Sequence, residues 1–148
     1  MSGGTGGKEG KIMAFDLGRR RIGVAMTDAG GLMAHSLTTL EVKSSAGALE
    51  KVLSIIRDHQ PDELLVGLPV NMDGTRGPES ERCKKFAEEL SRATGLPVSL
   101  WDERLTTVMA ERSLVEQGLS RKKRKGVVDK VAALLLLQDF IHHRRVVE

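Results

Sequence analysis

The chain has 148 residues, 40% of them hydrophobic and 29% charged, and a formal net charge of +3. This size fits one domain with a hydrophobic core, and the single cysteine, Cys83, excludes an internal disulfide and a cysteine-based zinc site. Three Phe, one Trp and no Tyr are too few aromatic residues for a protein that binds single strands mainly by base stacking.

The first half of the chain predicts three strands, a helix and a fourth strand. Strands are expected over 11–17, 22–27 and 32–41, joined by short turns at 18–21 and 28–31 into an antiparallel meander. Apolar residues at helical spacing predict a helix over 45–59. The continuous apolar run 63–68 is typical of a central strand that is buried on both faces.

The second half predicts helices that alternate with one more strand. Pro78 suits the first position of a helix that extends to about 93, and residues 98–101 form the next expected strand. Helices are then expected over 106–118 and, after a basic segment, over 127–142. This order predicts an α/β fold in which a mixed five-stranded sheet is flanked by helices.

The domain organisation follows from the ends of the chain. Residues 1–10 are Gly-rich and lack the apolar core of a signal peptide, so we expect a flexible N-terminal tail. Residues 11–148 are expected to form a single domain, because no internal linker or repeat interrupts them. No apolar run approaches the ~18 residues that span a membrane, and we expect a cytoplasmic protein.

Acidic residues follow two of the predicted strands. Asp16 lies late in the first strand and Asp102–Glu103 ends the fifth, where ligands bind in open α/β sheets. Asp62 and Glu63 begin the fourth strand, at the opposite edge, and are excluded. Alternation along a strand sends residues 102 and 103 to opposite faces, so only one should face Asp16, and the spacing leaves open which.

A carboxylate cluster of this kind suits a divalent cation. Carboxylates within a few ångströms of each other need a compensating charge, and oxygen ligands suit Mg²⁺ or Mn²⁺. One or two such ions could serve, and a pair about 3.5–4 Å apart supports hydrolysis of a phosphodiester. Asp129 is a further candidate ligand, although a carboxylate near the start of a helix also has a purely structural use.

Basic residues flank the candidate ligands. One run follows Asp16 directly, a second run precedes Asp129, and the polar loop 71–76 is expected near the same edge of the sheet. Such segments suit a polyanionic backbone, and the alternative is a solvated charged surface. The candidate nucleic-acid contacts are Arg19, Arg20, Arg21, Asn71, Arg76, Arg104, Lys122, Lys123, Arg124 and Lys125.

Four segments, FDLGRRRIGVA (15–25), VGLPVNMDGTRGP (66–78), WDERLTT (101–107) and VDKVAALLLLQ (128–138), together resemble the YqgF/RuvX-like family over residues 12–140. The resemblance implies a ribonuclease H-like fold and metal-dependent phosphodiester hydrolysis with Asp16, Glu103 and Asp129 as the acidic triad. It thereby favours Glu103 over Asp102. Strand four of this chain lacks the terminal acid that is usual in ribonuclease H-like proteins, so Glu103 would take its place.

The resemblance also implies a substrate. It indicates maturation of the 5′ end of pre-16S rRNA, with the small ribosomal subunit as a partner, and a Holliday junction or other structured DNA is the alternative. Two other hypotheses are a non-catalytic RNA-binding assembly factor and an actin-like ATPase, although an ATPase of that kind needs two such domains. Either a monomer or a homodimer is compatible with the sequence.

Overall fold

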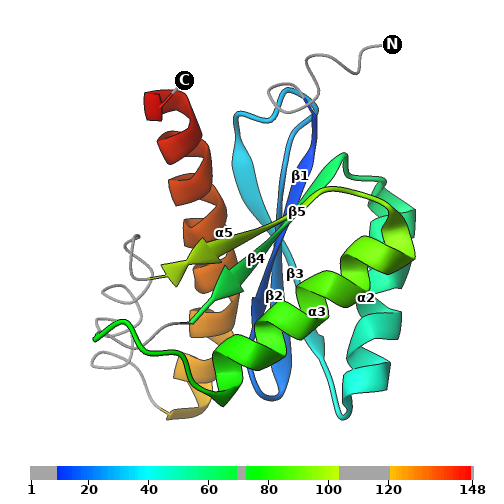
Figure 1. The fold of residues 1–148 in the computed structure, drawn as a ribbon, viewed down its shortest axis with the longest axis vertical. Coiled ribbons are helices and arrows are strands. Elements are labelled where there is room, and N and C mark those ends of the chain that lie inside the picture. Colours follow the sequence, from blue (N-terminus) through cyan, green and yellow to red (C-terminus); the bar gives the residue numbers. More distant parts are fainter. Residues whose placement is uncertain (1–9, 70–72, 104–120, 148) are drawn as a thin grey trace.

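The computed structural model describes residues 10–69, 73–103 and 121–147, with side chains in the last segment from 131 to 144. Its centre is a five-stranded sheet in the order β3-β2-β1-β4-β5, with α2 and α3 on one face and α5 on the other (Figure 1). The predicted mixed sheet with flanking helices is confirmed. The expected tail, apart from Gly10, and the helix expected over 106–118 lie outside the described residues.

The sheet combines an antiparallel meander with two parallel strands. β1 (Ile12–Leu17), β2 (Arg21–Thr27) and β3 (Ala34–Glu41) form the meander. β4 (Glu63–Leu68) runs parallel to β1, and β5 (Val98–Asp102) runs parallel to β4. All six residues of β4 are buried, as its apolar run predicts.

The β2–β3 turn is longer than predicted, because β3 begins at residue 34 and not at 32. Oδ1 of Asp28 accepts hydrogen bonds from the backbone N–H groups of Leu32 (3.2 Å) and Met33 (3.5 Å). These bonds hold residues 28–33 in the turn, where Leu32 and Met33 are exposed. Hydrogen bonds to the side chain of Asp28 thus take the place of strand pairing at residues 32 and 33.

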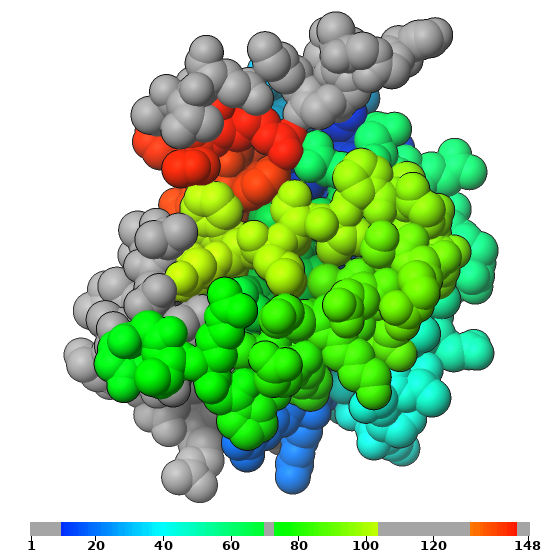
Figure 2. All heavy atoms as spheres, in the orientation of Figure 1, coloured from blue at the N-terminus to red at the C-terminus, as the bar shows by residue number. Residues whose placement is uncertain are grey.

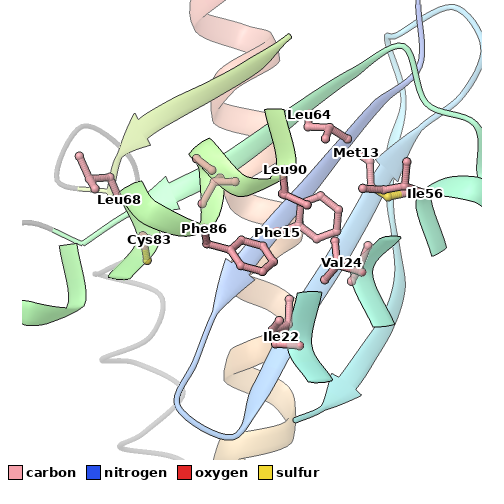
Figure 3. Close-up of a cluster of buried hydrophobic side chains, with 14 of the residues drawn as sticks. Met13, Phe15, Ile22, Val24, Ile56, Leu64, Leu68, Cys83, Phe86 and Leu90 are labelled. Carbon is pink, nitrogen blue, oxygen red and sulfur yellow. The ribbon is translucent and has the colours of Figure 1, made fainter. Parts of the chain in front are cut away.

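The larger core lies between the sheet and helices α2 (Ser45–His59) and α3 (Pro78–Thr94). The side chain of Ser44 caps α2 by accepting from the N–H of Gly47 at 3.1 Å. The hydroxyl of Ser80 donates to the carbonyl of Pro69, which ties the start of α3 to the end of β4. α3 and β5 form much of the face seen in Figure 2. The buried cluster includes Met13, Phe15, Ile22, Val24, Leu64, Phe86 and Leu90 (Figure 3).

The second core is narrower and lies beneath α5 (Arg121–Val147). It joins side chains of β1, β2, β4 and β5 to Ala132, Ala133, Leu136, Leu137 and Phe140. The helix is longer than the predicted 127–142, because the basic run that was expected to be a separate segment forms its first turns. Lys and Arg are good helix formers, which accounts for the earlier start. None of the described helices is both long and apolar enough to span a membrane.

Candidate active site

Asp16 lies near the C-terminal end of β1, on the face that α5 covers. Its neighbours Ile12 and Ala14 belong to the core beneath α5, whereas Met13 and Phe15 belong to the opposite core. Side chains alternate along a strand, so Asp16 shares the face of Ala14. The residue is only 3% exposed. A carboxylate this deeply buried requires compensating interactions.

Glu103 follows β5 directly and is 4% exposed, whereas Asp102 is only partly buried. Trp101 packs in the core beneath α5, edge to face with Phe140. A Cβ atom placed on Gly67 of β4 would lie 3.5 Å from Oε2 of Glu103. The carboxylate of Glu103 therefore reaches back from β5 over position 67 of β4.

The strand register brings Asp16 and Glu103 to the same place. Phe15 pairs with Val66, so continuing by one residue sets Asp16 beside Gly67. Adjacent strands are separated by about 4.8 Å. The carboxylate of Glu103 lies over this neighbouring position, 3.5 Å from where a Cβ on Gly67 would lie. Two buried carboxylates thus share the C-terminal ends of three adjacent strands.

The thiol of Cys83 is buried on α3, on the side of the sheet opposite α5. Burial raises its pKa from 9.0 to about 12, the guanidinium of Arg82 opposes this rise, and the charges of Glu103 and Asp16 add to it. Both carboxylates therefore lie within electrostatic range of the thiol. With its pKa near 12 and 1% exposure, Cys83 serves neither as a nucleophile nor as a thiolate ligand.

At the opposite end of the sheet, Glu63 has a different environment. Its two carboxylate oxygens accept hydrogen bonds from Nη1 and Nη2 of Arg144 at 2.9 and 2.8 Å. Asp62 is exposed there and accepts from the backbone N–H of Lys11 at 2.8 Å. Both residues lie away from Asp16, as expected from the strand direction.

Asp129 is not at the start of a helix, and the prediction that placed it there is wrong. It stands eight residues after Arg121, more than two turns into α5. The helix dipole acts mainly within the first turn, so it gives no structural reason for an acid here. Positions 129, 132, 133 and 136 follow helical spacing along one face, and the last three pack on the sheet. The side chain of Asp129 lies outside the described part of the chain.

The candidate nucleic-acid contacts are only partly described. Arg19 and Arg20 are exposed in the β1–β2 turn, soon after Asp16, and Arg21 is partly buried at the start of β2. Arg76 is exposed before α3. Asn71 and Arg104 lie outside the described residues. The backbone of α5 carries the last four candidates, Lys122, Lys123, Arg124 and Lys125, whose side chains are not described.

The donors at the strand ends suit a hard divalent cation. Asp16 and Glu103 offer carboxylate oxygens, which Mg²⁺ and Mn²⁺ prefer. Among the described side chains, no group of three or more His, Cys, Asp or Glu residues is arranged to hold a metal ion. The described part of the candidate centre is therefore this pair of carboxylates.

A family model described as RuvX, Holliday junction resolvase, matches residues 10–143. The chain belongs to the RuvX family. This assignment confirms the predicted enzyme class, a nuclease that hydrolyses phosphodiester bonds, and nucleic acid as its binding partner. It also agrees with a divalent cation as cofactor.

Relatives cover nearly the whole chain. A protein of Thermoanaerobacter pseudethanolicus named "Putative pre-16S rRNA nuclease" is 43% identical over 136 residues, which are 91% of this chain and 98% of that protein. A protein of the same name from Halothermothrix orenii is 44% identical over 134 residues, covering 90% and 96% of the two chains.

Solved structures confirm the predicted ribonuclease H-like fold. The Thermus thermophilus RuvC structure in complex with a Holliday junction substrate has a TM-score of 0.57 at 17% identity, covering 92% of this chain and 96% of that one. The fowlpox virus Holliday junction resolvase has a TM-score of 0.56 at 12% identity, covering 90% and 99%. These neighbours establish the arrangement of the elements.

Two residues near the candidate site were missed in the sequence. Gly67 lies beneath Glu103 and lets Leu136 of α5 approach closely, and the sequence offered only the glycine inside an otherwise apolar strand as a signal. Arg82 donates to the backbone after Asp16, from a helix 64 residues later in the chain. No local pattern distinguishes Arg82 from the other basic residues of α3.

Proposed function

We propose that this protein is a divalent-metal-dependent nuclease that matures the 5′ end of pre-16S rRNA in the cytoplasm. The observation that carries the site is the carboxylate of Glu103 over Gly67, at the strand position beside Asp16. The substrate is taken from the names of relatives that are 43–44% identical over nearly all of the chain. Their length matches that of this chain, which supports transfer of the activity to the whole protein.

Asp16, Glu103 and Asp129 would hold one or two Mg²⁺ or Mn²⁺ ions. Such an ion supplies Lewis-acid stabilisation of the negative charge that develops at the phosphodiester. The carboxylates of Asp16 and Glu103 would orient the ion through their fixed positions on β1 and after β5. Burial of both residues strengthens their interaction with a cation, because solvent screens it less.

Arginine and lysine residues around these strand ends would hold the RNA backbone. Arg19 and Arg20 project from the turn that follows Asp16, and Arg76 precedes α3. We include Arg21, Asn71, Arg104 and the basic first turns of α5, Lys122 to Lys125, in the same interface. Their contacts with phosphate predict an affinity that falls as the salt concentration rises. We propose that the bound partner is the precursor RNA of the small ribosomal subunit.

Cleavage of 5′-extended precursor rRNA by purified protein with Mn²⁺ tests this proposal. We expect a shortened 5′ end with the wild-type protein and with Asp58→Asn, which changes an exposed carboxylate of α2. Asp16→Asn is expected to abolish cleavage. Binding of the RNA without cleavage in any divalent metal would instead identify a non-catalytic assembly factor.

The description of the family model favours a second substrate, the Holliday junction. A four-way DNA junction incubated under the same conditions separates the two. Cleavage of the junction at a rate equal to or above that of the precursor RNA would assign the protein to structured DNA.

A further inference from the structure

A hydrogen-bond network joins the first turn of α3 to the turn that follows Asp16. Nη2 of Arg82 donates to the carbonyl oxygens of Leu17 at 3.1 Å and Gly18 at 3.3 Å. The same guanidinium donates through Nε and Nη2 to Oε1 of Glu79, at 3.1 and 2.9 Å. One side chain of α3 therefore holds the two carbonyl groups that come directly after Asp16.

Glu79 extends the network to the arginine run. Its Oε2 accepts a hydrogen bond from Nε of Arg19 at 3.3 Å. The hydrogen bond from Arg82, with a smaller contribution from Arg19, holds the pKa of Glu79 below its usual value. Glu79 is therefore ionised at neutral pH and orients both guanidinium groups.

Apolar packing beneath the turn is incomplete. A cavity of about 90 Å³ lies between the strand ends and the helices, and its lining includes Leu17, Ile22, Val42, Arg82 and Phe86. This is more space than one water molecule needs. Arg82 therefore supplements this packing with hydrogen bonds from α3 to the backbone of the turn.

Two further bonds show how the turn is closed. The N–H of Gly18 donates to the carbonyl of Arg21, and the N–H of Val42 donates to the carbonyl of Arg20, both at 2.8 Å. They hold the second half of the turn, whereas Arg82 holds the first half, next to Asp16. Figure 2 shows the start of α3 beside the β1–β2 turn at the lower rim of the molecule.

We propose that Arg82 is a positioning residue. By holding the carbonyls of Leu17 and Gly18, it fixes the backbone at the end of β1, and with it the orientation of Asp16 and of the run Arg19–Arg21. The inference rests on the proposed function for the role of Asp16 as a metal ligand. The planar fork of arginine donates to the backbone and to Glu79 at once, which a lysine ammonium cannot do with the same geometry. Lysine at this position should therefore restore the charge but only part of the function.

The test compares Arg82→Gln and Arg82→Lys with Arg92→Gln, a control that changes an exposed arginine in the last turn of the same helix. Three properties are measured: hydrogen exchange of the amides at 18–21, the Mn²⁺ dissociation constant, and kcat and KM for cleavage. For Arg82→Gln we expect at least about tenfold faster exchange in the turn and about tenfold weaker Mn²⁺ binding, because orienting partners of metal ligands contribute about 10–100-fold. The loss should fall on kcat more than on KM.

Arg82→Lys is expected to lie between Arg82→Gln and the wild type, and it replaces Arg82→Gln in the comparison if the latter does not fold. Arg92→Gln should match the wild type. Unchanged turn exchange and Mn²⁺ affinity in a folded Arg82 variant overturn the inference, as does a fall in thermal stability alone. Wild-type protein that neither binds Mn²⁺ through Asp16 nor cleaves RNA overturns the proposed function, and that outcome is distinct because it does not involve Arg82.

Discussion

The two ends of the central sheet both bury carboxylates, but the side chains around these carboxylates differ. At the start of β4, Glu63 forms a bidentate pair with Arg144, whose guanidinium also lies 4.5 Å above the ring of Phe140. At the far end, Asp16 and Glu103 gather around Gly67. The first arrangement pairs a carboxylate with a guanidinium, whereas the second brings two carboxylates to adjacent strand ends. Burial of a carboxylate alone therefore does not mark a site, and the proposed site rests on the second carboxylate at an adjacent strand end.

The largest effect is expected from neutralising the carboxylates at the strand ends. Asp16→Asn and Glu103→Gln each remove a charge with little change in shape. We expect cleavage to slow by on the order of 100-fold or more, because a lost metal ligand removes several kcal/mol of transition-state stabilisation. Thermal stability should stay close to that of the wild type, because each amide keeps the shape of the carboxylate that it replaces. Single-turnover cleavage and calorimetry measure the two quantities, and wild-type rates in both variants would contradict the assignment.

At the opposite end of the sheet, removing a partner of the buried carboxylate should lower stability and leave Mn²⁺ binding unchanged. Arg144→Ala leaves the buried Glu63 without its guanidinium and is expected to lower the free energy of unfolding by about 3 kcal/mol, the lower end of the range for buried pairs because Arg144 is partly exposed. Mn²⁺ affinity should not change. The double variant Glu63→Gln, Arg144→Met should recover part of the stability in urea unfolding. A loss of Mn²⁺ binding in Arg144→Ala would remove the distinction between the two ends.

A smaller effect is expected from filling the space at Gly67. In Gly67→Ala, the new Cβ would lie 3.1 Å from Cδ2 of Leu136 and 3.5 Å from Oε2 of Glu103. We expect about tenfold slower cleavage and a loss of about 1 kcal/mol, as for mild overpacking. Gly30→Ala is the matched control, since its Cβ would meet only Oδ1 of Asp28 at 3.7 Å. Equal behaviour of the two variants would show that Glu103 does not depend on the space at Gly67.

The smallest effect concerns Glu79, which is paired like Glu63 but stands near the candidate site. Hydrogen bonds from Arg82 and Arg19 lower its pKa below 4.5, so its pairing contributes stability above that pH and loses it as the pH falls through the depressed value. The exposure of Arg19 and the partial exposure of Glu79 and Arg82 make the contribution small. Thermal unfolding of the wild type and Glu79→Gln should therefore converge as the pH falls below the depressed pKa of Glu79. A difference that grows with acidity would contradict this pairing.

Much of the fold was predictable because its signals are local. The apolar run of β4, the short turns of the meander and the helical spacing of α2 each lie within one segment of sequence. The predicted starts of β3 and α5 were wrong, and in both cases the cause is also local. Asp28 binds the backbone of Leu32 and Met33 and delays β3, and the basic run before Gly126 starts α5 early.

The site was less predictable, because its decisive features depend on contacts between distant segments. Strand direction brought Asp16 and the acids after β5 to one edge, but spacing could not choose between Asp102 and Glu103. Trp101 packs beneath α5, and the carboxylate of Glu103, two residues later, lies over Gly67 of β4. The reach of Arg82 to Leu17 spans 65 residues and leaves no trace in either segment.

The central claim, that Asp16 and Glu103 form one metal centre, is tested most directly by a crystal structure of the protein soaked in Mn²⁺. The anomalous signal locates the ion independently of any activity. We predict a peak coordinated by the carboxylates of Asp16 and Glu103 above Gly67, with Asp129 as a third ligand, and no such peak in crystals of Asp16→Asn. A peak at other residues only, or none at millimolar Mn²⁺, would contradict this account.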